Sequence, residues 1–367
     1  MEYVNLGDVA TYINGYAFKP EQRGKKGLPI IRIQDLNGNS HDLGFFDGEY
    51  PEQVEINTGD ILISWSGSLG VYKWNKGKAL LNQHIFKVLF NKIEIDKEYF
   101  CYAIRNSLSS MSQQTHGATM KHITKKDFDN ISIPYPDLNV QRQIANNLER
   151  VNELIESYEK ELILLEQLIK ARFIEMFGST HNSKTFVYYP LNEITTVCSG
   201  GTPNRDNKAY WESGTIPWVK TTELKNNRLT HVEEFITELG LEESSAKLVP
   251  SDTVLIAMYG QGKTRGMTGY LEIEATTNQA CACILPTNKM NMIYLWKYFE
   301  LSYDKLRELA KGGNQPNLNC TMIRDFKILV PPIELQNQYA DFVQQVDKSR
   351  FDIKKSITEL EREVVYD

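Results

Sequence analysis

The chain has 367 residues, with 41 basic and 47 acidic side chains, a formal net charge of -6 and 41% hydrophobic residues. This length predicts at least two domains, and a charged fraction of 24% with 19 Tyr, 15 Phe and 5 Trp excludes a globally disordered chain. The first residues show no basic stretch before an apolar run, and no run of ~18 apolar residues occurs, so we expect neither a secretion signal nor a membrane span.

The same succession of short motifs occurs twice along the chain. In the first half it comprises residues 6–9, 28–36 and 59–63, then Asn82 and Gln83, then Pro136 with Gln141 and Gln143. In the second half the counterparts are residues 191–194, 215–224 and 251–256, then Asn278 and Gln279, then Pro331 with Gln336 and Gln338. Five matches in one order predict an internal repeat of a single domain.

Each copy is predicted to consist mainly of strands and loops. Its apolar runs, such as 61–65 and 254–259, are short, rich in β-branched and aromatic residues, and bounded by Gly, Asn and Asp. Short helices are predicted at 97–110 and 292–310, where apolar residues recur at spacings of three and four.

Each copy ends in a pattern of a different kind, in which apolar residues alternate between steps of four and three, as in the seam of a left-handed coiled coil. The predicted seam residues are Ile144, Leu148, Val151, Ile155, Tyr158, Leu162, Leu165, Ile169, Phe342, Val346, Ile353, Ile357, Leu360 and Val364. Pro136 and the pair Pro331 and Pro332 should precede the two helices, because proline is tolerated at a helix start and not within it. Gly178 is expected to cap the first helix at its C-terminus.

A lone apolar helix is unstable in water, so we expect the two long helices to pair with each other. The predicted fold class is α+β, with two similar strand-rich domains at 1–137 and 181–333 and a pseudo-two-fold internal repeat. Two long helices, at 138–180 and 334–367, are expected to separate these domains and to pair as an antiparallel coiled coil. The alternative is that each helix packs on its own globular domain.

The negative charge lies on the helical segments. Residues 1–137 carry a net charge of -1 and residues 181–333 a net charge of 0, so the two helical segments supply the other -5. An acidic helix is expected to face solvent or a protein rather than phosphates.

Basic, amide and hydroxyl side chains gather in the predicted loops, in a mixture that suits phosphates and base edges. In the first copy the candidate DNA-binding residues are Lys19, Arg23, Lys25, Lys26, Gln34, Ser64, Trp65, Ser66, Asn82, Gln83, His84, Thr119 and Lys121. In the second copy they are Thr202, Asn204, Arg205, Lys208, Lys220, Tyr259, Gln261, Lys263, Thr264, Arg265, Asn278, Gln279, Asn314, Gln315 and Asn317. Because loops are commonly polar, this pattern alone is weak evidence for DNA binding.

Catalytic and cofactor motifs are not evident. Residues 257–264 nearly spell a phosphate-binding loop, but a loop-forming sequence replaces the helix that must follow Lys263. No nucleophile setting or His-x-x-x-His spacing occurs, so we expect a noncatalytic chain without a cofactor of its own.

The five cysteines are odd in number and irregularly spaced, which favours reduced thiols and a cytoplasmic protein. Cys281 and Cys283 would face the same side of an alternating strand and belong to the core. No second pair stands at zinc-finger spacing, so we expect no metal site.

This arrangement of two strand-rich copies, each followed by a heptad helix, resembles the specificity subunit of type I restriction-modification systems over nearly the whole chain. The motifs that carry the resemblance are residues 200–203 (Gly-Gly-Thr-Pro), their aromatic variant at 15–18, Pro217 with Trp218, residues 59–62, residues 251–255, the two Asn-Gln pairs, residues 117–120 and the two Pro-to-Gln helix starts. The Gly-Thr-Pro motif is intact only in the second copy, so the sequence does not predict equivalent loop contacts in the first copy.

The resemblance implies a noncatalytic subunit with two target-recognition domains, each reading one half of a bipartite target in double-stranded DNA. The helices would set the spacing between the halves and dock two adenine-N6 methyltransferase subunits, which bring S-adenosylmethionine. Separate restriction subunits would bring ATP and Mg²⁺ to the full complex. The alternative is a coiled-coil adaptor whose repeated domains bind protein and do not read DNA.

Overall fold

The computed structural model describes residues 2–39, 42–67, 69–114, 124–180, 182–183, 185–260, 262–310 and 317–366. The chain forms two compact units, Met1–Ser157 with Ile357–Asp367, and Tyr158–Ser356. Each long helix is therefore divided between the two units. The division expected from the sequence, with the helices as separate segments, stays a prediction.

The described strands of the first unit form three sheets. An antiparallel sheet in the order β2-β9-β6-β7 contains β2 (Thr11–Asn14), β9 (Ile85–Leu89), β6 (Ile61–Ser64) and β7 (Gly70–Lys73). A sheet in the order β4-β3-β8-β5 contains β4 (Phe45–Phe46), β3 (Leu28–Ile31), β8 (Ala79–Leu81) and β5 (Glu55–Ile56), with β3 and β8 parallel. The third sheet pairs β1 (Tyr3–Asn5) with β10 (Ser132–Pro134).

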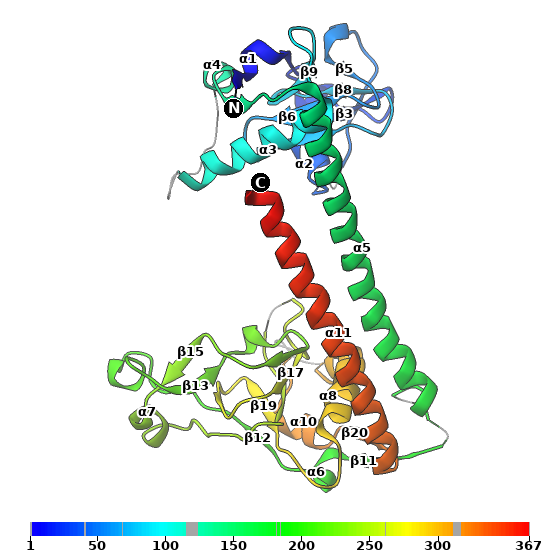
Figure 1. Cartoon of the computed structure of the whole chain (residues 1–367). Helices are drawn as coiled ribbons and strands as arrows, with labels where there is room; N and C mark the ends of the chain where they lie inside the picture. The colour runs from blue at the N-terminus through cyan, green and yellow to red at the C-terminus, as the bar shows by residue number, and fades with distance from the viewer. Residues whose placement is uncertain are drawn as a thin grey trace. The chain divides into compact units, whose positions relative to one another are not determined.

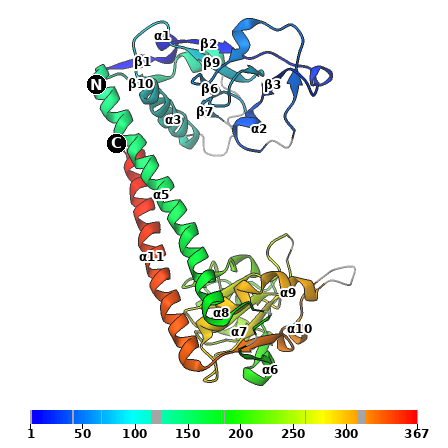
Figure 2. The same cartoon turned by 90° about the vertical axis from the view of Figure 1, so that its right-hand side faces the viewer.

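The helices of the first unit are α1 (Leu6–Val9), α2 (Ile33–Leu36), α3 (Lys97–Gln114), α4 (Lys125–Asp129) and the start of α5 (Leu138–Phe177), with single turns at η1 (Pro20–Gln22) and η2 (Glu52–Val54). The helix α3 lies beside the sheet that contains β6 and β7 (Figure 2). Its Phe100 and Ile104 are fully buried in one cluster with Ile63 and Phe86 of that sheet. This helix and sheet therefore form the main core of the first unit.

The second unit repeats this strand order. Its larger sheet runs β12-β19-β16-β17-β14 and contains β12 (Val197–Ser199), β19 (Cys281–Ile284), β16 (Val254–Ala257), β17 (Thr268–Leu271) and β14 (Asn227–Leu229). Its smaller sheets are β15-β13-β18, with β15 (Glu234–Ile236), β13 (Ile216–Val219) and β18 (Thr276–Thr277), and β11-β20, with β11 (Val187–Pro190) and β20 (Lys327–Val330). The strand β14 extends the sheet beyond the four-strand order that both units share.

The helices of the second unit are α6 (Leu191–Ile194), α7 (Glu238–Glu242), α8 (Met292–Leu301), α9 (Tyr303–Leu309), α10 (Cys320–Arg324) and most of α11 (Ile333–Tyr366), with turns at η3 (Lys208–Tyr210) and η4 (Thr221–Glu223). The helix α8 lies between the large sheet and α11 (Figure 1). The predicted helix at 292–310 is divided at Ser302, which is fully buried and lies between α8 and α9.

The strand β19 is buried on both faces. Cys281 and Cys283 belong to one apolar cluster, and Ala282 and Ile284 to another. This alternation confirms that both thiols face the same side of a strand and belong to the core.

Both long helices start in the same way. Gln141 and Gln336 are 1% exposed. The amide nitrogen of Gln141 donates to the carbonyl of Pro136 at 2.8 Å, and its oxygen accepts from the backbone of Asp96 at 2.9 Å. Gln336 makes the same two bonds with Pro331 at 2.7 Å and Asn291 at 3.0 Å. The repeated Pro-to-Gln motif therefore fixes each helix start to the loop before α3 or α8.

Within the second unit, the last turns of α5 lie against the first turns of α11. The ring of Phe173 packs edge-on to Tyr339 at 5.5 Å, and the Tyr339 hydroxyl donates to the carbonyl of Ile169 at 3.3 Å. Arg172 lies over the ring of Phe342 at 5.8 Å. The two segments therefore run in opposite directions, and both pack into the core of this unit.

The predicted seam residues lie on the less exposed face of each long helix. Every seam residue is buried or partly buried, whereas Ile163, Leu164 and Leu168 are 56%, 62% and 46% exposed. Gly178 ends α5 with φ +78, and its amide donates to Ile174 at 2.9 Å, as predicted for a C-terminal cap. Within the described part of the chain, every helix is too short or too polar to cross a membrane.

Candidate nucleic-acid interface

The loops that follow β2, β6 and β8 are hydrogen-bonded to one another in the first unit. The amide of Tyr16 donates to the carbonyl of Leu81 at 2.8 Å, and the amide of Gln83 donates to the carbonyl of Tyr16 at 3.0 Å. The amide of Trp65 donates to the carbonyl of His84 at 3.2 Å. Three segments that are far apart in the sequence therefore form one polar loop cluster.

The second unit builds the same cluster from the loops that follow β12, β16 and β18. The amide of Gly201 donates to Thr277 at 2.9 Å, and the amide of Met258 donates to Ala280 at 2.8 Å. The Thr202 hydroxyl donates to the carboxamide oxygen of Gln279.

One glycine in each cluster is required by a close backbone approach. A Cβ atom added to Gly15 would lie 2.0 Å from the carbonyl oxygen of Asn82. A Cβ atom added to Gly200 would lie 2.1 Å from the carbonyl oxygen of Thr277. The first copy therefore keeps the close backbone contact between its loops although its Gly-Thr-Pro motif is not intact.

A family model for the type I restriction modification DNA specificity domain matches this chain twice, at residues 1–167 and 183–362. The chain belongs to the specificity subunits of type I restriction-modification systems. The resemblance stated from the sequence motifs is confirmed.

Relatives share this assignment at low identity. The EcoBI specificity subunit of Escherichia coli is 23% identical over 96% of this chain and 81% of its own length. The MjaVIII specificity subunit of Methanocaldococcus jannaschii is 24% identical over 94% of this chain and 86% of its own length.

Solved structures support the same fold. The S subunit from M. genitalium aligns over 99% of this chain and 93% of its own, with a TM-score of 0.59 and 17% identity. A chain from a structural study of complex assembly in the type I system aligns over 99% of this chain and 95% of its own, with a TM-score of 0.63 and 18% identity.

The predicted DNA-binding residues of this specificity subunit fall into groups by exposure. Exposed residues are Lys19, Lys25, Lys26, Gln34, Gln83, Asn204, Arg205, Lys208, Tyr259, Lys263, Gln279 and Asn317. Partly buried residues are Arg23, Trp65, His84, Thr202, Lys220, Thr264, Arg265 and Asn278, and buried residues are Ser64, Ser66 and Asn82. Thr119, Lys121, Gln261, Asn314 and Gln315 lie outside the described residues.

Three of the predicted cations in the second unit are paired with carboxylates, and one of them, Lys208, lies 3.5 Å from Glu212 in a pair that is exposed to solvent. Arg205 lies 3.7 Å from the ring centroid of Trp211 and pairs with Glu234. Lys220 lies 2.7 Å from Glu233 and 3.0 Å from Glu234, and these carboxylates raise the pKa of Lys220. Because their charges are locally neutralised, Arg205 and Lys220 are weaker candidates for phosphate contacts than exposed lysines such as Lys25 and Lys263.

Lys263 and Arg265 lie on the hairpin that joins β16 to β17, where a phosphate-binding loop would need a helix. The Tyr303 hydroxyl donates to the carbonyl of Lys263 at 2.7 Å, and Arg307 donates to the carbonyl of Arg265 at 2.9 Å. The helix α9 thus holds the hairpin backbone, which positions both basic side chains.

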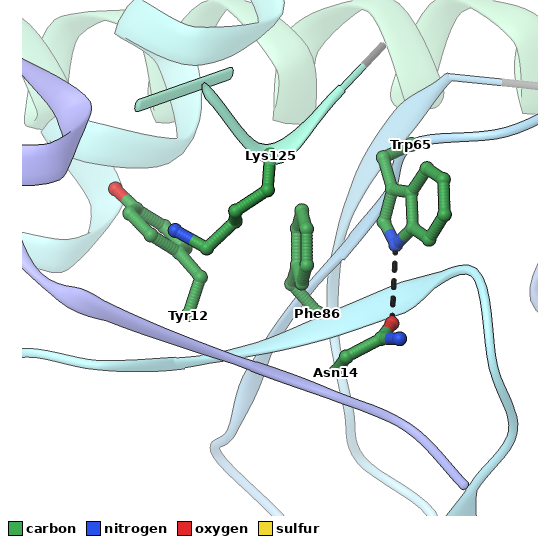
Figure 3. Close-up of a pocket in the computed structure, with 5 residues that line it drawn as sticks. All are labelled: Tyr12, Asn14, Trp65, Phe86 and Lys125. Carbon is green, nitrogen blue, oxygen red and sulfur yellow. Dashed lines mark hydrogen bonds between the residues drawn. The ribbon is translucent and has the colours of Figure 1, made fainter. Parts of the chain in front are cut away.

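Sequence analysis missed most of the residues around a pocket in the first unit. The pocket is lined by Tyr12, Asn14, Trp65, Phe86 and Lys125 (Figure 3), and only Trp65 was a candidate. Tyr12 and Asn14 are two apart on β2, so the period of two places them on one face of the strand. The register that sets Asn14 opposite Phe86 is not readable from the sequence.

The thiols of the second unit form a pair between neighbouring strands. Cys198 lies directly opposite Cys283 on β19. A hydrogen bond from the Cys283 thiol, with Lys247 and Arg324 nearby, holds the pKa of Cys198 below its usual value. The same bond and burial raise the pKa of Cys283. In the described part of the chain, no group of three His, Cys, Asp or Glu residues is arranged to hold a metal ion.

Proposed function

We propose that this specificity subunit is a noncatalytic DNA-binding protein in which each unit reads one half of a bipartite double-stranded target. The observation that carries this proposal is the recurrence of one loop cluster at the same strand ends in both units. The rigid backbone bonds within each cluster support such a role, because base readout requires side chains that are held in place.

The chemistry of the exposed side chains supports two kinds of DNA contact. Gln83 and Gln279 follow the repeated asparagine at equivalent positions, and both are exposed. A glutamine carboxamide can donate to and accept from a base edge, so these two residues are proposed to read bases. The exposed lysines, such as Lys25 and Lys263, are proposed to contact phosphates, which position the protein without reading sequence.

An apolar row on α5 supports a protein partner for the helix. Leu164 and Leu168 are 62% and 46% exposed, and together with Leu165 and Ala171 they line a shallow groove of about 380 Å³. Their spacing of four and three places Leu164, Leu168 and Ala171 on one helix face. Exposed apolar patches commonly mark protein interfaces, so we assign this row to the docking of methyltransferase subunits, two in the complex.

The remaining parts of the proposal concern the assembly. The long helices pair along their length as an antiparallel coiled coil and set the spacing between the half-sites. The methyltransferase subunits carry S-adenosylmethionine, and restriction subunits carry ATP and Mg²⁺, in the cytoplasm.

Inserting whole heptads into α5 and α11 should lengthen the spacer between the half-sites without altering the bases read. An unchanged spacer would contradict this role.

The decisive experiment is methylation mapping by single-molecule sequencing in cells that express this chain with its methyltransferase partner. We expect modified adenines in one split motif, and their loss when this chain is deleted. Unchanged methylation, with the partner present and active, would favour the alternative of a protein-binding adaptor.

A second experiment tests DNA contact directly. Lys263→Ala with Arg265→Ala should weaken duplex binding and reduce the steepness of its salt dependence by about 1 for each phosphate that is no longer neutralised. The control, Lys327→Ala with Lys348→Ala, removes the same charge from β20 and α11. The adaptor alternative predicts no difference between the two double variants.

A further inference from the structure

The pocket of the first unit is a small aromatic recess. Its volume is about 280 Å³, near the lower limit of ~300 Å³ for small-molecule pockets, which suits one small planar ring. The lining residues come from β2, β9, the end of β6 and the first turn of α4.

Aromatic rings form the apolar wall of this pocket. Trp65 is stacked on Phe86 at 5.6 Å with an interplanar angle of 22°, and Tyr12 lies 6.0 Å from Phe86. The Tyr12 hydroxyl donates to the carbonyl of Leu6 at 3.0 Å, so this polar group is used elsewhere and the ring lines the pocket. Figure 3 shows Phe86 between the Trp65 indole and the Lys125 side chain.

The polar groups of the pocket are mainly donors. The Trp65 indole donates to the side-chain oxygen of Asn14 at 3.3 Å, so the amide nitrogen of Asn14 is the group left to donate to a ligand. The ammonium group of Lys125 lies 5.1 Å from the centroid of Tyr12 and 5.7 Å from that of Phe86, and it pairs with Asp129. A ligand that fits these groups is a flat ring that carries carbonyl oxygens.

The pocket lies beside the loop cluster of the first unit. Trp65 belongs to both, since its ring lies 5.0 Å from His84 and its amide donates to the same residue. Asn14 directly precedes Gly15, whose close approach to Asn82 holds the cluster together. A base that leaves the helical stack beside these loops would therefore meet the pocket.

We propose that this pocket binds an unstacked nucleobase, with thymine as the best fit because it presents two carbonyl oxygens and a methyl group. The ring would lie on the aromatic wall, and its carbonyl oxygens would face Asn14 and Lys125. This inference rests on the proposed DNA-binding function. Stacking on aromatic side chains offsets the loss of base stacking most readily for a base that is already unpaired.

The test compares three duplexes of one sequence by fluorescence anisotropy with the full chain. One is fully paired, one carries a single bulged thymine, and one carries the same bulge without its base. We expect the thymine bulge to bind about 10-fold more tightly than the abasic bulge, because only the former fills the pocket. Equal affinity for the two bulges would overturn the inference, since a preference for bent DNA alone cannot separate them.

Four variants locate the effect, each checked for an unchanged thermal midpoint. Trp65→Ala and Lys125→Ala should abolish the preference for the thymine bulge, while Lys126→Ala, which removes the same charge from the next exposed residue, should retain it. Asn14→Asp keeps an acceptor for the Trp65 indole but replaces the amide donor with a carboxylate, so it should also abolish the preference.

The remaining outcomes separate this inference from the proposed function. The thymine preference could persist in Trp65→Ala and Asn14→Asp while binding to the paired duplex is retained. That result would reject the binding of a base in this pocket but not the proposed DNA-binding function. Failure to bind any duplex would reject both. If Trp65→Ala and Asn14→Asp instead weakened co-purification of the methyltransferase with no change in the thymine preference, the pocket would be a protein contact and the inference would be wrong.

Discussion

The two units place different side chains at the same structural position. In the first unit, Asn14 stands opposite Phe86, and Trp65 follows β6. In the second unit, the equivalent pair is Ser199 and Ala282, and the residue that follows β16 is Met258. Trp65 is partly buried in the wall of the aromatic pocket, whereas its counterpart Met258 is 3% exposed. Phe86 and Ala282 are buried in both units, at 4% and 0% exposure.

The short helix beside this position also carries different side chains in the two units. Lys125 follows the Thr124 cap of α4 and lies over aromatic rings. Its counterpart Cys320 follows the Asn319 cap of α10, and its sulfur lies 3.7 Å from that of Met258. The repeat therefore retains backbone bonds, caps and close glycine contacts while the side chains at the strand ends differ. Such divergence would let one scaffold carry two different DNA-reading surfaces.

The largest expected effect is on the aromatic cluster of the first unit. Phe86→Ala should lower the free energy of unfolding by about 3–5 kcal/mol, because Phe86 is 4% exposed and its ring contacts Tyr12, Trp65 and Phe128. Urea unfolding measures this loss, with hydrogen exchange to locate it. Phe351→Ala, at a side chain that is 68% exposed, is the matched control and should change little. A loss no larger than that of the control would show that this cluster does not hold the sheet.

Both units share a glycine that lies against the backbone of a neighbouring loop. Gly15→Ala and Gly200→Ala should each cost about 1–3 kcal/mol, since the new methyl group would overlap a backbone carbonyl at 2.0 or 2.1 Å. Gly24→Ala is the control, because its Cβ would meet no atom closer than 3.8 Å. Denaturant midpoints of the three variants test this expectation. A tolerated change at only one of the first two positions would mean that the loop clusters are not equivalent.

Exchanging Trp65 and Met258 between the two units should lower the free energy of unfolding by different amounts. Met258→Trp adds volume to a buried position and should cost about 1–3 kcal/mol, whereas Trp65→Met adds no volume at a partly buried position and should cost less. Thermal midpoints of both variants measure this difference. Equal losses would indicate that the pocket of the first unit is as tightly packed as the core of the second.

The sequence was sufficient to predict features that depend on local pattern. Short apolar runs rich in β-branched residues identified β6 and β16, the four-three spacing identified α5 over Leu138–Phe177, and Gly178 marked its end. Each of these follows from residues that are neighbours in the chain, where side-chain periodicity and proline or glycine chemistry determine the backbone.

The features that sequence analysis missed depend on contacts between distant segments. Lys125 joins the pocket because α4 packs near β2, and this depends on the tertiary fold. The neutralisation of Arg205 by Glu234 is equally non-local, since the two residues are 29 positions apart. Charge counting along the chain could not identify which cations lie beside a carboxylate.

The smallest expected effect is chemical and distinguishes the thiols of the two units. Burial raises the pKa of Cys101 in the first unit to about 11, whereas the Cys283 thiol lowers the pKa of Cys198 in the second. Because the thiolate is the reactive form, iodoacetamide should label Cys198 readily near neutral pH and leave Cys101 unmodified. Peptide mass spectrometry from about pH 6 to pH 9 measures both rates.

The direction of the pH dependence follows from the lowered pKa of Cys198. Its thiolate stabilises the folded state above the pKa of the unfolded thiol, and this contribution is lost as pH falls through the lower folded pKa. Cys283→Ala removes the donor, so it should slow labelling of Cys198 near pH 7 and leave Cys101 unlabelled. If Cys198 labelled at the same rate in both proteins, the hydrogen bond across β12 and β19 would not control this thiol.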